Sequence, residues 1–227
     1  MKKVIVISLG GSQIIPDKVN YSYLKKFKEV IIKHKKKYKI VVVCGGGNLA
    51  RKYIEAIAKE KGDLYHQSLV GINATRANAR FVSYFFGYNP EWGIPHNIKT
   101  LKKYLKKRNF VICGALKYKP NQTSDSTAAE IARKLKGEFV NVTNIKGLYD
   151  KNPKMFKNAK YIPKITWKKF NKLAQKIKFK PGQHFVLDQT ASKIIMENKI
   201  KTLIIKDVKE LDNFLKNKKF VGTVIEG

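Results

Sequence analysis

Acidic residues are scarce in this chain. Its 227 residues include 16 Asp or Glu against 48 Lys or Arg, which gives a formal net charge of +32. Most of the cations are lysines spread over every helical pattern, whereas base recognition usually relies on arginines grouped with aromatic rings. We interpret the excess as a compositional bias with solvated helix faces and regard nucleic-acid binding as the weaker alternative. The positive field favours small anionic ligands such as nucleotides.

Cysteine is rare, and long apolar runs are absent. Cys44 and Cys113 each end a buried-strand pattern one residue before a glycine, which is typical of small buried side chains and not of a zinc site. No apolar run is long enough to span a bilayer, and the N-terminus has the pattern of a strand and a glycine turn, not of a signal peptide. We therefore expect a cytoplasmic protein. No nucleophile, base and orienting group can be assembled, which argues against hydrolysis by a triad.

Short apolar, β-branched runs alternate with helical patterns. Four of these runs end in small or polar residues, and they lie at Val4–Leu9, Lys39–Cys44, Asn109–Cys113 and Phe139–Asn144. This alternation predicts a parallel α/β sheet, in which ligands bind at the carboxyl ends of the strands. The length suits one sizeable domain or two tightly joined lobes. Neither a Walker A loop nor a G-x-G-x-x-G fingerprint is present.

The remaining elements follow from periodicity and capping. A loop is predicted from Gly147 to about Pro163, and a last strand over Lys201–Ile205. Helices are predicted over residues 21–34, 51–61, 69–86, 99–107, 166–176 and 209–215, with further helix starts at 123–126 and near 188. The helix over 69–86 is rich in small residues, which permit close packing. Arg76 and Asn78 in it suit either a subunit interface or a contact within the domain.

The most informative stretch runs from Val41 to Lys52. A buried-strand pattern ends in the three glycines Gly45–Gly47, and a helical pattern follows at once. Glycines at a helix start let an anion approach unpaired backbone N–H groups and the positive end of the helix dipole. Arg51 lies about one turn inside that helix, where its guanidinium can bind the same anion. The stretch therefore predicts a phosphate site, and a glycine turn that binds nothing is the alternative.

Four consecutive hydroxyl- or carboxyl-bearing residues, Thr123–Ser126, precede another helical pattern. A helix cap uses one or two of them, so the stretch exceeds what a cap requires. Asp125 matters because carboxylates are scarce and because the predicted sheet brings it to the carboxyl ends of the strands. It is a candidate to orient a catalytic lysine or to hold magnesium, with a purely capping role as the alternative.

Taken in order, these motifs resemble those of the amino-acid kinase superfamily and, within it, the archaeal uridylate kinases. The matching pieces are Ser8-Leu9-Gly10-Gly11-Ser12, Gly45-Gly46-Gly47-x-Leu49-Ala50-Arg51, Gly71-Ile72-x-x-Thr75-Arg76-Ala77-Asn78, Thr123-Ser124-Asp125-x-x-Ala128-Ala129, Thr143-Asn144-x-x-Gly147-x-Tyr149 and Leu187-Asp188-x-x-Ala191-x-Lys193. The resemblance implies an α/β fold, a three-layer α/β/α sandwich on a mostly parallel sheet. It implies a single domain over residues 1–227, with an acceptor-binding lobe at about 1–137 and an ATP-binding lobe at about 138–227.

The resemblance also implies a reaction and its site. The reaction is Mg²⁺-dependent transfer of the γ-phosphoryl group of ATP to UMP, a step of pyrimidine nucleotide biosynthesis, in a homo-oligomer, a hexamer built from dimers. By position, Arg51 and Asp125 serve catalysis, and no set of protein ligands dedicated to a metal is expected. The residues expected to bind ATP are Gly10, Gly11, Gly47, Arg51, Thr143, Tyr149 and Asn152. The residues expected to bind UMP are Gly46, Ser68, Tyr118, Lys119, Pro120, Asn121, Gln122, Thr123 and Ser124.

Several positions depart from the superfamily pattern. The loop between Gly114 and Thr123 is longer and less rich in glycine than usual, and Lys146 and Asn152 stand where relatives usually carry acidic residues, which implies a change in ATP and metal binding. Ser8 stands where many members carry a lysine that contacts the transferring phosphoryl group. The candidates to replace that cation are Lys117, Lys119 and Lys146. Ser68 stands where relatives carry an aspartate that binds the ribose of UMP, which implies a change in acceptor affinity or sugar selectivity.

Two other functions remain open at this stage. One is a catalytically slow, nucleotide-binding regulator that keeps the fold and the UMP pocket. The departures at Ser8 and Ser68 favour this hypothesis. The other is a kinase of another small phosphate, such as isopentenyl phosphate. In the pattern of the related isopentenyl phosphate kinases, the helix after the three glycines carries a histidine. This chain has Asn48-Leu49-Ala50-Arg51 there, which favours a nucleotide as the acceptor.

Overall fold

The computed structural model describes residues 2–89, 93–120, 122–151, 153, 155–176 and 187–227. Within these residues, a seven-stranded sheet has the strand order β3-β2-β1-β4-β8-β9-β7. The strands are β1 (Val4–Leu9), β2 (Lys39–Cys44), β3 (Phe110–Cys113), β4 (Glu138–Val142), β7 (Lys164–Ile165), β8 (Thr202–Ile205) and β9 (Gly222–Ile225). The strands β3, β2, β1, β4 and β8 run parallel, and β9 pairs antiparallel with β8. The predicted parallel sheet is confirmed.

Strand β1 lies in the interior of the sheet, where its apolar run is buried on both faces. It pairs with β2 on one side and with β4 on the other. Ile5, Ile7 and Leu9 point into one hydrophobic core, and Val6 points into the other. The carboxyl ends of β3, β2, β1 and β4 therefore lie next to one another at one edge of the sheet, which is the arrangement that the sequence predicts.

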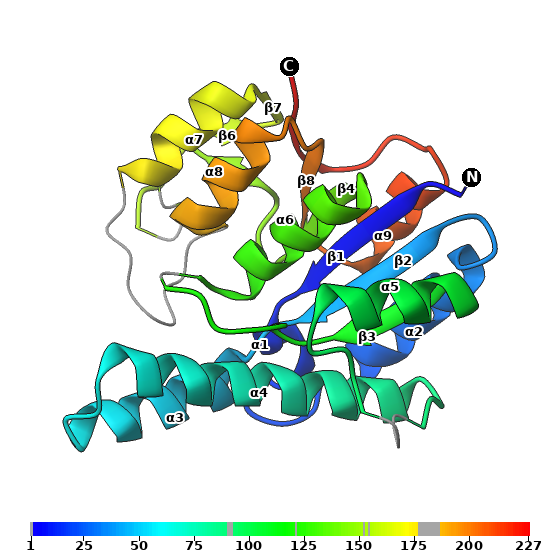
Figure 1. Cartoon of the computed structure of the whole chain (residues 1–227). Coiled ribbons are helices and arrows are strands. Elements are labelled where there is room, and N and C mark those ends of the chain that lie inside the picture. The colour runs from blue at the N-terminus through cyan, green and yellow to red at the C-terminus, as the bar shows by residue number, and fades with distance from the viewer. Residues whose placement is uncertain (1, 90–92, 121, 152, 154, 177–186) are drawn as a thin grey trace.

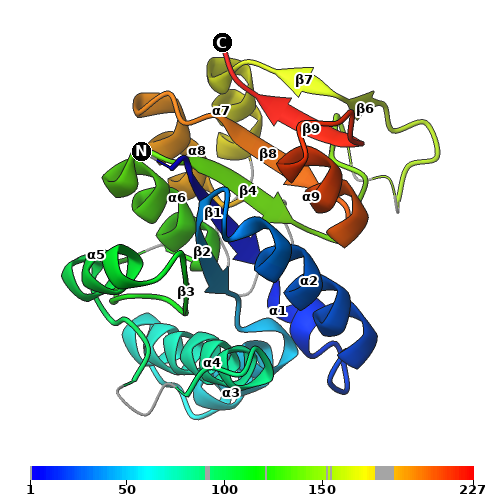
Figure 2. The ribbon, with the colours of Figure 1, turned by 90° about the vertical axis from the view of Figure 1, so that its right-hand side faces the viewer.

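Helices cover both faces of the sheet. They are α1 (Gly11–Ile14), α2 (Tyr21–His34), α3 (Gly47–Lys59), α4 (Leu64–Phe85), α5 (Ile98–Lys107), α6 (Ser124–Leu135), α7 (Trp167–Gln175), α8 (Gln189–Glu197) and α9 (Val208–Leu215). Helices α2 and α9 lie on one side and α5, α6 and α8 on the other (Figure 2), so the three-layer α/β/α sandwich is confirmed. Helices α3 and α4 lie side by side near α1 (Figure 1). None of the described helices combines the length and the apolar character needed to cross a bilayer.

The structure differs from the sequence prediction at several element ends. Helix α4 begins five residues before the predicted Leu69, because the Asp63 carboxylate accepts a hydrogen bond from the N–H of His66 and caps it at Leu64. The segment predicted as a loop contains two short antiparallel strands, β5 (Leu148–Tyr149) and β6 (Tyr161–Ile162). Strands of two residues are too short to show a period of two, so the pattern could not reveal them.

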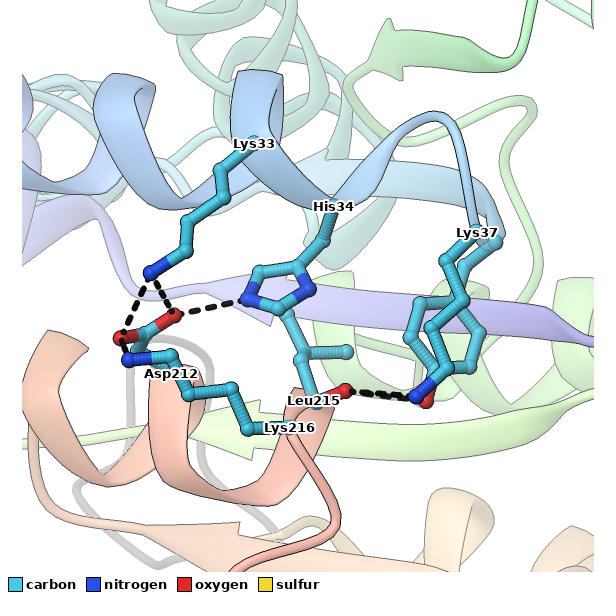
Figure 3. Close-up of polar contacts among 7 residues, drawn as sticks. Lys33, His34, Lys37, Asp212, Leu215 and Lys216 are labelled. Atoms are coloured by element: carbon cyan, nitrogen blue, oxygen red, sulfur yellow. Dashed lines mark hydrogen bonds and ion pairs between the residues drawn. The ribbon is translucent and has the colours of Figure 1, made fainter.

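A cluster of charged side chains joins α2 to α9 (Figure 3). The Asp212 carboxylate lies 2.7 Å from Nε2 of the buried His34, 3.3 Å from Nζ of Lys33 and 2.6 Å from Nζ of Lys216. Desolvation acts to raise the pKa of Asp212, but the hydrogen bonds from Lys216, His34 and Lys33 outweigh it and lower that pKa to about 2. The cluster therefore holds the two helices of this layer together when Asp212 is ionised.

We expect Asp212→Asn to lower the free energy of unfolding by about 1–2 kcal/mol near neutral pH. The pKa of Asp212 is lower in the folded chain than the value of about 3.9 in unfolded chains. Its contribution is therefore present above about pH 4 and is lost as the pH falls through about 2. Urea unfolding between neutral and acid pH should show the difference from wild type shrinking, whereas Glu29→Gln, at an exposed acid on α2, should have little effect. A difference that stays constant down to about pH 2 would contradict this account.

Candidate active site

Two glycine turns meet at the carboxyl ends of β1 and β2. A Cβ on Gly11 would lie 2.2 Å from the backbone nitrogen of Gly47, and a Cβ on Gly47 would lie 2.5 Å from the carbonyl carbon of Gly11. Gly47 also has a φ of +60°. Only glycine permits this backbone contact. Gly10 differs, because the nearest atom to a Cβ there is 3.8 Å away, in ordinary van der Waals contact. The site therefore has glycines of two kinds, packed ones and an open one.

The two helices that begin at these turns lack side-chain caps. Helix α1 has Gly10 as its N-cap and α3 has Gly46, and no side chain caps either helix. Side chains cap the other described helices, and they belong to Asn20, Asp63, Asn97, Thr123, Thr166, Asp188 and Asp207. The first N–H groups of α1 and α3 are therefore left for another acceptor. Two adjacent uncapped helix starts suit the oxygens of a phosphate chain.

Arg51 lies one turn into α3, as predicted. Its Nη2 donates a hydrogen bond to Oδ1 of Asn48 over 3.3 Å, and Asn48 in turn donates to the carbonyl of Pro16 over 3.0 Å. In the described part of the chain, no carboxylate lies within ion-pair distance of Arg51. A guanidinium has five N–H donors, so most of its capacity is left for an anion at the glycine turns.

Asp125 does not act as the cap of α6. Thr123 is the N-cap, and the hydroxyl of Ser126 completes a capping box with it. The Asp125 carboxylate instead accepts a hydrogen bond of 2.6 Å from the hydroxyl of the buried Ser8 on β1. Desolvation raises the pKa of Asp125 to about 7; the hydrogen bond from Ser8 acts against this rise, and the charge of Asp188 adds to it. The purely capping role is wrong for this residue.

Asp188 is a site residue to which the sequence assigned only a helix start. It caps α8 by accepting the N–H of Ala191 over 2.7 Å. Its carboxylate also accepts from the hydroxyl of Thr123 over 2.6 Å, and from the hydroxyl and the N–H of Ser126 over 2.6 and 3.1 Å. The residue is 2% exposed, and the four hydrogen bonds to its carboxylate oxygens offset the cost of burying this polar group. It joins the starts of α6 and α8 and so positions Thr123.

Arg76 and Asn78 both serve contacts within the domain. Nδ2 of Asn78 donates to the carbonyl of Gly45 over 2.8 Å and fixes the second glycine turn. Arg76 donates to the carbonyls of Ala115 and Leu116 over 3.1 and 2.7 Å. Helix α4 therefore holds both the β2–α3 turn and the loop that follows β3.

The residues predicted to bind an acceptor fall into two groups. Gly46, Thr123 and Ser124 come together, since the Ser124 hydroxyl lies 3.4 Å from where a Cβ of the adjacent Gly45 would be, and the partly buried Gln122 directly precedes them. Ser68 uses its hydroxyl inside α4, where it donates to the carbonyl of Leu64 over 2.6 Å. Further along the loop, Tyr118 packs on Tyr65, Lys119 lies 4.0 Å from Glu130, and Pro120 is exposed. Asn121 lies outside the described residues.

The described residues predicted to bind the nucleoside of ATP lie directly after β4 and on β5. Thr143 follows β4, and its N–H donates to the carbonyl of Ile205 over 2.9 Å. The Tyr149 ring on β5 lies 5.7 Å from the ring of Tyr161, and Nζ of Lys146 lies 4.8 Å from that second ring. Asn152 lies outside the described residues. Lys117 is exposed, so Lys117, Lys119 and Lys146 all remain candidates for the missing cation of β1.

The acidic groups suit one Mg²⁺ held mainly by substrate. No cluster of three or more His, Cys, Asp or Glu side chains that could hold a metal occurs within the ranges that the structure describes. Ser8 donates to Oδ1 of Asp125, which leaves Oδ2 outside that hydrogen bond. Mg²⁺ in phosphoryl-transfer sites is bound through one or two carboxylates and the phosphates. Asp125 therefore fits this ion, whereas Asp188 is already saturated with hydrogen bonds.

We expect Asp125→Asn to stabilise the metal-free chain above neutral pH. The folded pKa of about 7 exceeds the unfolded value, so ionising Asp125 costs stability as the pH rises from about 4 to about 7. Asparagine keeps an acceptor for Ser8 and cannot ionise, so the variant should gain roughly 2–3 kcal/mol at about pH 8 relative to pH 5. Urea unfolding with a chelator measures this gain. Equal shifts at both pH values would show that Asp125 does not titrate in this range.

The glycine turns, the uncapped helix starts and the order of the strands correspond to a known class of protein. The model of the amino acid kinase family matches residues 3–206, so the chain belongs to that family. Its relatives include the uridylate kinases of Thermococcus kodakarensis, 32% identical over 98% of this chain and 99% of the relative, and of Thermoplasma acidophilum, 33% identical over 100% and 98%. The crystal structure of uridylate kinase from Archaeoglobus fulgidus superposes with a TM-score of 0.83 at 28% identity, over 99% of this chain and 100% of the other. The family that the sequence motifs resemble is thereby confirmed.

Proposed function

We propose that this chain is an ATP-dependent UMP kinase that forms UDP and ADP in pyrimidine nucleotide biosynthesis. The observation that carries the proposal is the pair of uncapped helix starts at Gly10 and Gly46, with Arg51 beside them. These groups occur in a chain that matches uridylate kinases along its whole length.

The chemistry asked of the site is positioning and charge neutralisation. Phosphoryl transfer needs the acceptor oxygen in line with the leaving group and little covalent participation by the protein. In our proposal, the backbone N–H groups at Gly10, Gly11 and Gly47 and the guanidinium of Arg51 bind the phosphates of ATP. The acceptor is a phosphate oxygen that is already anionic, so no general base is required. This explains a site without a triad.

On the acceptor side, Thr123 and Ser124 stand at the start of α6, where the helix dipole favours the phosphate of UMP. Asp188 fixes the rotamer of Thr123 through a hydrogen bond of 2.6 Å. On the donor side, Thr143 and Tyr149 flank the nucleoside of ATP. We accordingly assign acceptor binding to about residues 1–137 and ATP binding to about residues 138–227 of one domain.

Asp125 would hold Mg²⁺, and the ion would neutralise negative charge on the phosphates of the substrates. The protein's own contribution is to keep this carboxylate at the sheet edge through the hydrogen bond from Ser8. A carboxylate that is costly to ionise alone gains most from a cation beside it.

We also propose that the chain forms a homo-oligomer, a hexamer built from dimers, in the cytoplasm. Helix α3 has no buried residue even though apolar side chains line it, and Tyr53 on α3 is 48% exposed. Leu64 at the start of α4 is 63% exposed. Exposed apolar side chains on adjacent helices suit a subunit contact. Sedimentation equilibrium should give a hexamer, and a monomer at all concentrations would exclude this assembly.

The activity is tested by ADP formation with ATP and Mg²⁺ against UMP, CMP, dUMP and isopentenyl phosphate. Turnover that is highest with UMP is the expected result. Preference for isopentenyl phosphate would make the chain a kinase of another small phosphate. UMP binding in calorimetry without turnover would make it a nucleotide-binding regulator.

A further inference from the structure

The loop after β3 follows one face of α4. A Cβ on Gly114 would lie 2.7 Å from backbone atoms of Thr75 and Arg76, so the loop backbone touches the helix there. The N–H of Ala115 then donates to the hydroxyl of Thr75 over 2.9 Å, and Arg76 binds the next two carbonyls. The path of the loop from Gly114 to Leu116 is therefore fixed by α4.

The same face of α4 carries an aromatic contact near its start. The ring of Tyr118 lies 4.8 Å from the ring of Tyr65, and the two rings are perpendicular. Residues Tyr65, Ser68, Ile72 and Thr75 are spaced by three or four, which places them on one side of a helix. Ser68 therefore lies on the α4 face between the aromatic contact and the contact that Thr75 makes with the loop.

The Tyr65–Ser68 face of the helix offers a ring and a hydroxyl to a ligand, and the ring of His66, which is paired with Asp63, packs edge-on against Tyr65 at 5.7 Å. The ring-bearing side chain of Tyr65 is 47% exposed, and the Ser68 hydroxyl is directed to the carbonyl of Leu64 over 2.6 Å. Two perpendicular rings form a corner, where a flat base can stack on one ring and present its edge to the other. Further along the chain, the Ser124 hydroxyl lies 3.4 Å from where a Cβ on Gly45 of the second glycine turn would be.

We propose that Tyr65 and Tyr118 form an aromatic corner that stacks the pyrimidine base of the acceptor nucleotide, so that this chain selects its acceptor through the base and not through the ribose hydroxyls. The inference rests on the UMP kinase activity proposed above. It adds Tyr65 as a specificity residue and gives Tyr118 a defined role.

Removing either ring should weaken binding of the acceptor without changing the chemical step. Tyr65→Ala and Tyr118→Ala should each raise KM and Kd for UMP about tenfold, with kcat and KM for ATP unchanged. Tyr65→Phe and Tyr118→Phe keep the rings and should behave as wild type. Tyr84→Ala removes another exposed tyrosine of α4, 55% exposed near the other end of the helix, and is the matched control.

Two further acceptors test the basis of selection. dUMP lacks only the 2′-hydroxyl and should be phosphorylated within about threefold of UMP, whereas ribose 5-phosphate lacks the base and should lose about a hundredfold in kcat/KM. Urea unfolding of each variant establishes that it is folded.

The outcomes separate this inference from the proposed function. If the wild type phosphorylates UMP and both alanine variants keep its KM and Kd, Tyr65 and Tyr118 do not stack the base, and the proposed kinase activity stands. If the wild type binds UMP without turnover and the alanine variants bind about tenfold more weakly, the corner stands and the kinase activity fails. If the wild type neither binds nor phosphorylates UMP, both are overturned.

Discussion

Arg51→Ala is expected to lower kcat/KM for UMP phosphorylation by about a thousandfold. The guanidinium of Arg51 would no longer stabilise the negative charge on the phosphoryl group in the transition state. Among the described residues, the Arg51 side chain hydrogen-bonds only to Asn48, over 3.3 Å, so little of the fold's stability should depend on Arg51. The free energy of unfolding should change by less than about 0.5 kcal/mol. Steady-state kinetics with ATP and UMP, paired with urea unfolding, measures both quantities.

Arg51→Lys is the matched control. A lysine keeps the charge but cannot form the forked hydrogen bonds of a guanidinium, so we expect it to recover part of the lost activity. Wild-type turnover in Arg51→Ala would remove the arginine from the mechanism. Loss of activity accompanied by unfolding would instead give Arg51 a structural role.

Gly11→Ala is expected to destabilise the chain by about 3 kcal/mol or more, or to prevent folding, because its Cβ would lie 2.2 Å from the nitrogen of Gly47. Gly10→Ala is the matched control, one residue earlier in the same turn. Gly10 has φ −55° and ψ 132°, which alanine adopts readily, and a Cβ there meets nothing closer than 3.8 Å. That variant should fold with nearly wild-type stability.

The two variants differ in what they disturb. Gly10→Ala places a methyl group where the phosphates of ATP are proposed to approach, so KM for ATP should rise about tenfold while the free energy of unfolding changes little. Calorimetric ATP binding and urea unfolding report the two effects separately. Equal stability of the Gly10→Ala and Gly11→Ala chains would contradict the packing of the two turns.

The sheet was predictable because each long strand has a local sequence pattern that marks it. Val4–Leu9 and Lys39–Cys44 are β-branched runs that end at glycines, and both form strands with those bounds. Burial on both faces selects such runs in a parallel sheet. The hairpin of β5 and β6 could not be predicted, because each strand has two residues and is defined by its partner.

The glycine turns and the place of Arg51 one turn into α3 were predictable, because a strand that ends at glycines before a helix is a local pattern. The partners of its carboxylates were not predictable. Asp125 bonds Ser8, which is 117 positions away, and Asp188 bonds Thr123, which is 65 positions away. A helix-start pattern shows only the local role of an aspartate, and the long-range role depends on which helix ends the fold brings together. The same limit applies to Tyr65, whose partner Tyr118 lies on a distant loop.

The central claim is tested most directly by following the γ-phosphoryl group itself. ATP labelled with ³²P at the γ position is incubated with UMP, Mg²⁺ and the wild-type chain, and the products are separated by chromatography. The account predicts that the label appears in UDP, one for one with ADP, and that Arg51→Ala loses this transfer. Label released as inorganic phosphate, or label that stays in ATP while UMP is present in excess, would contradict it.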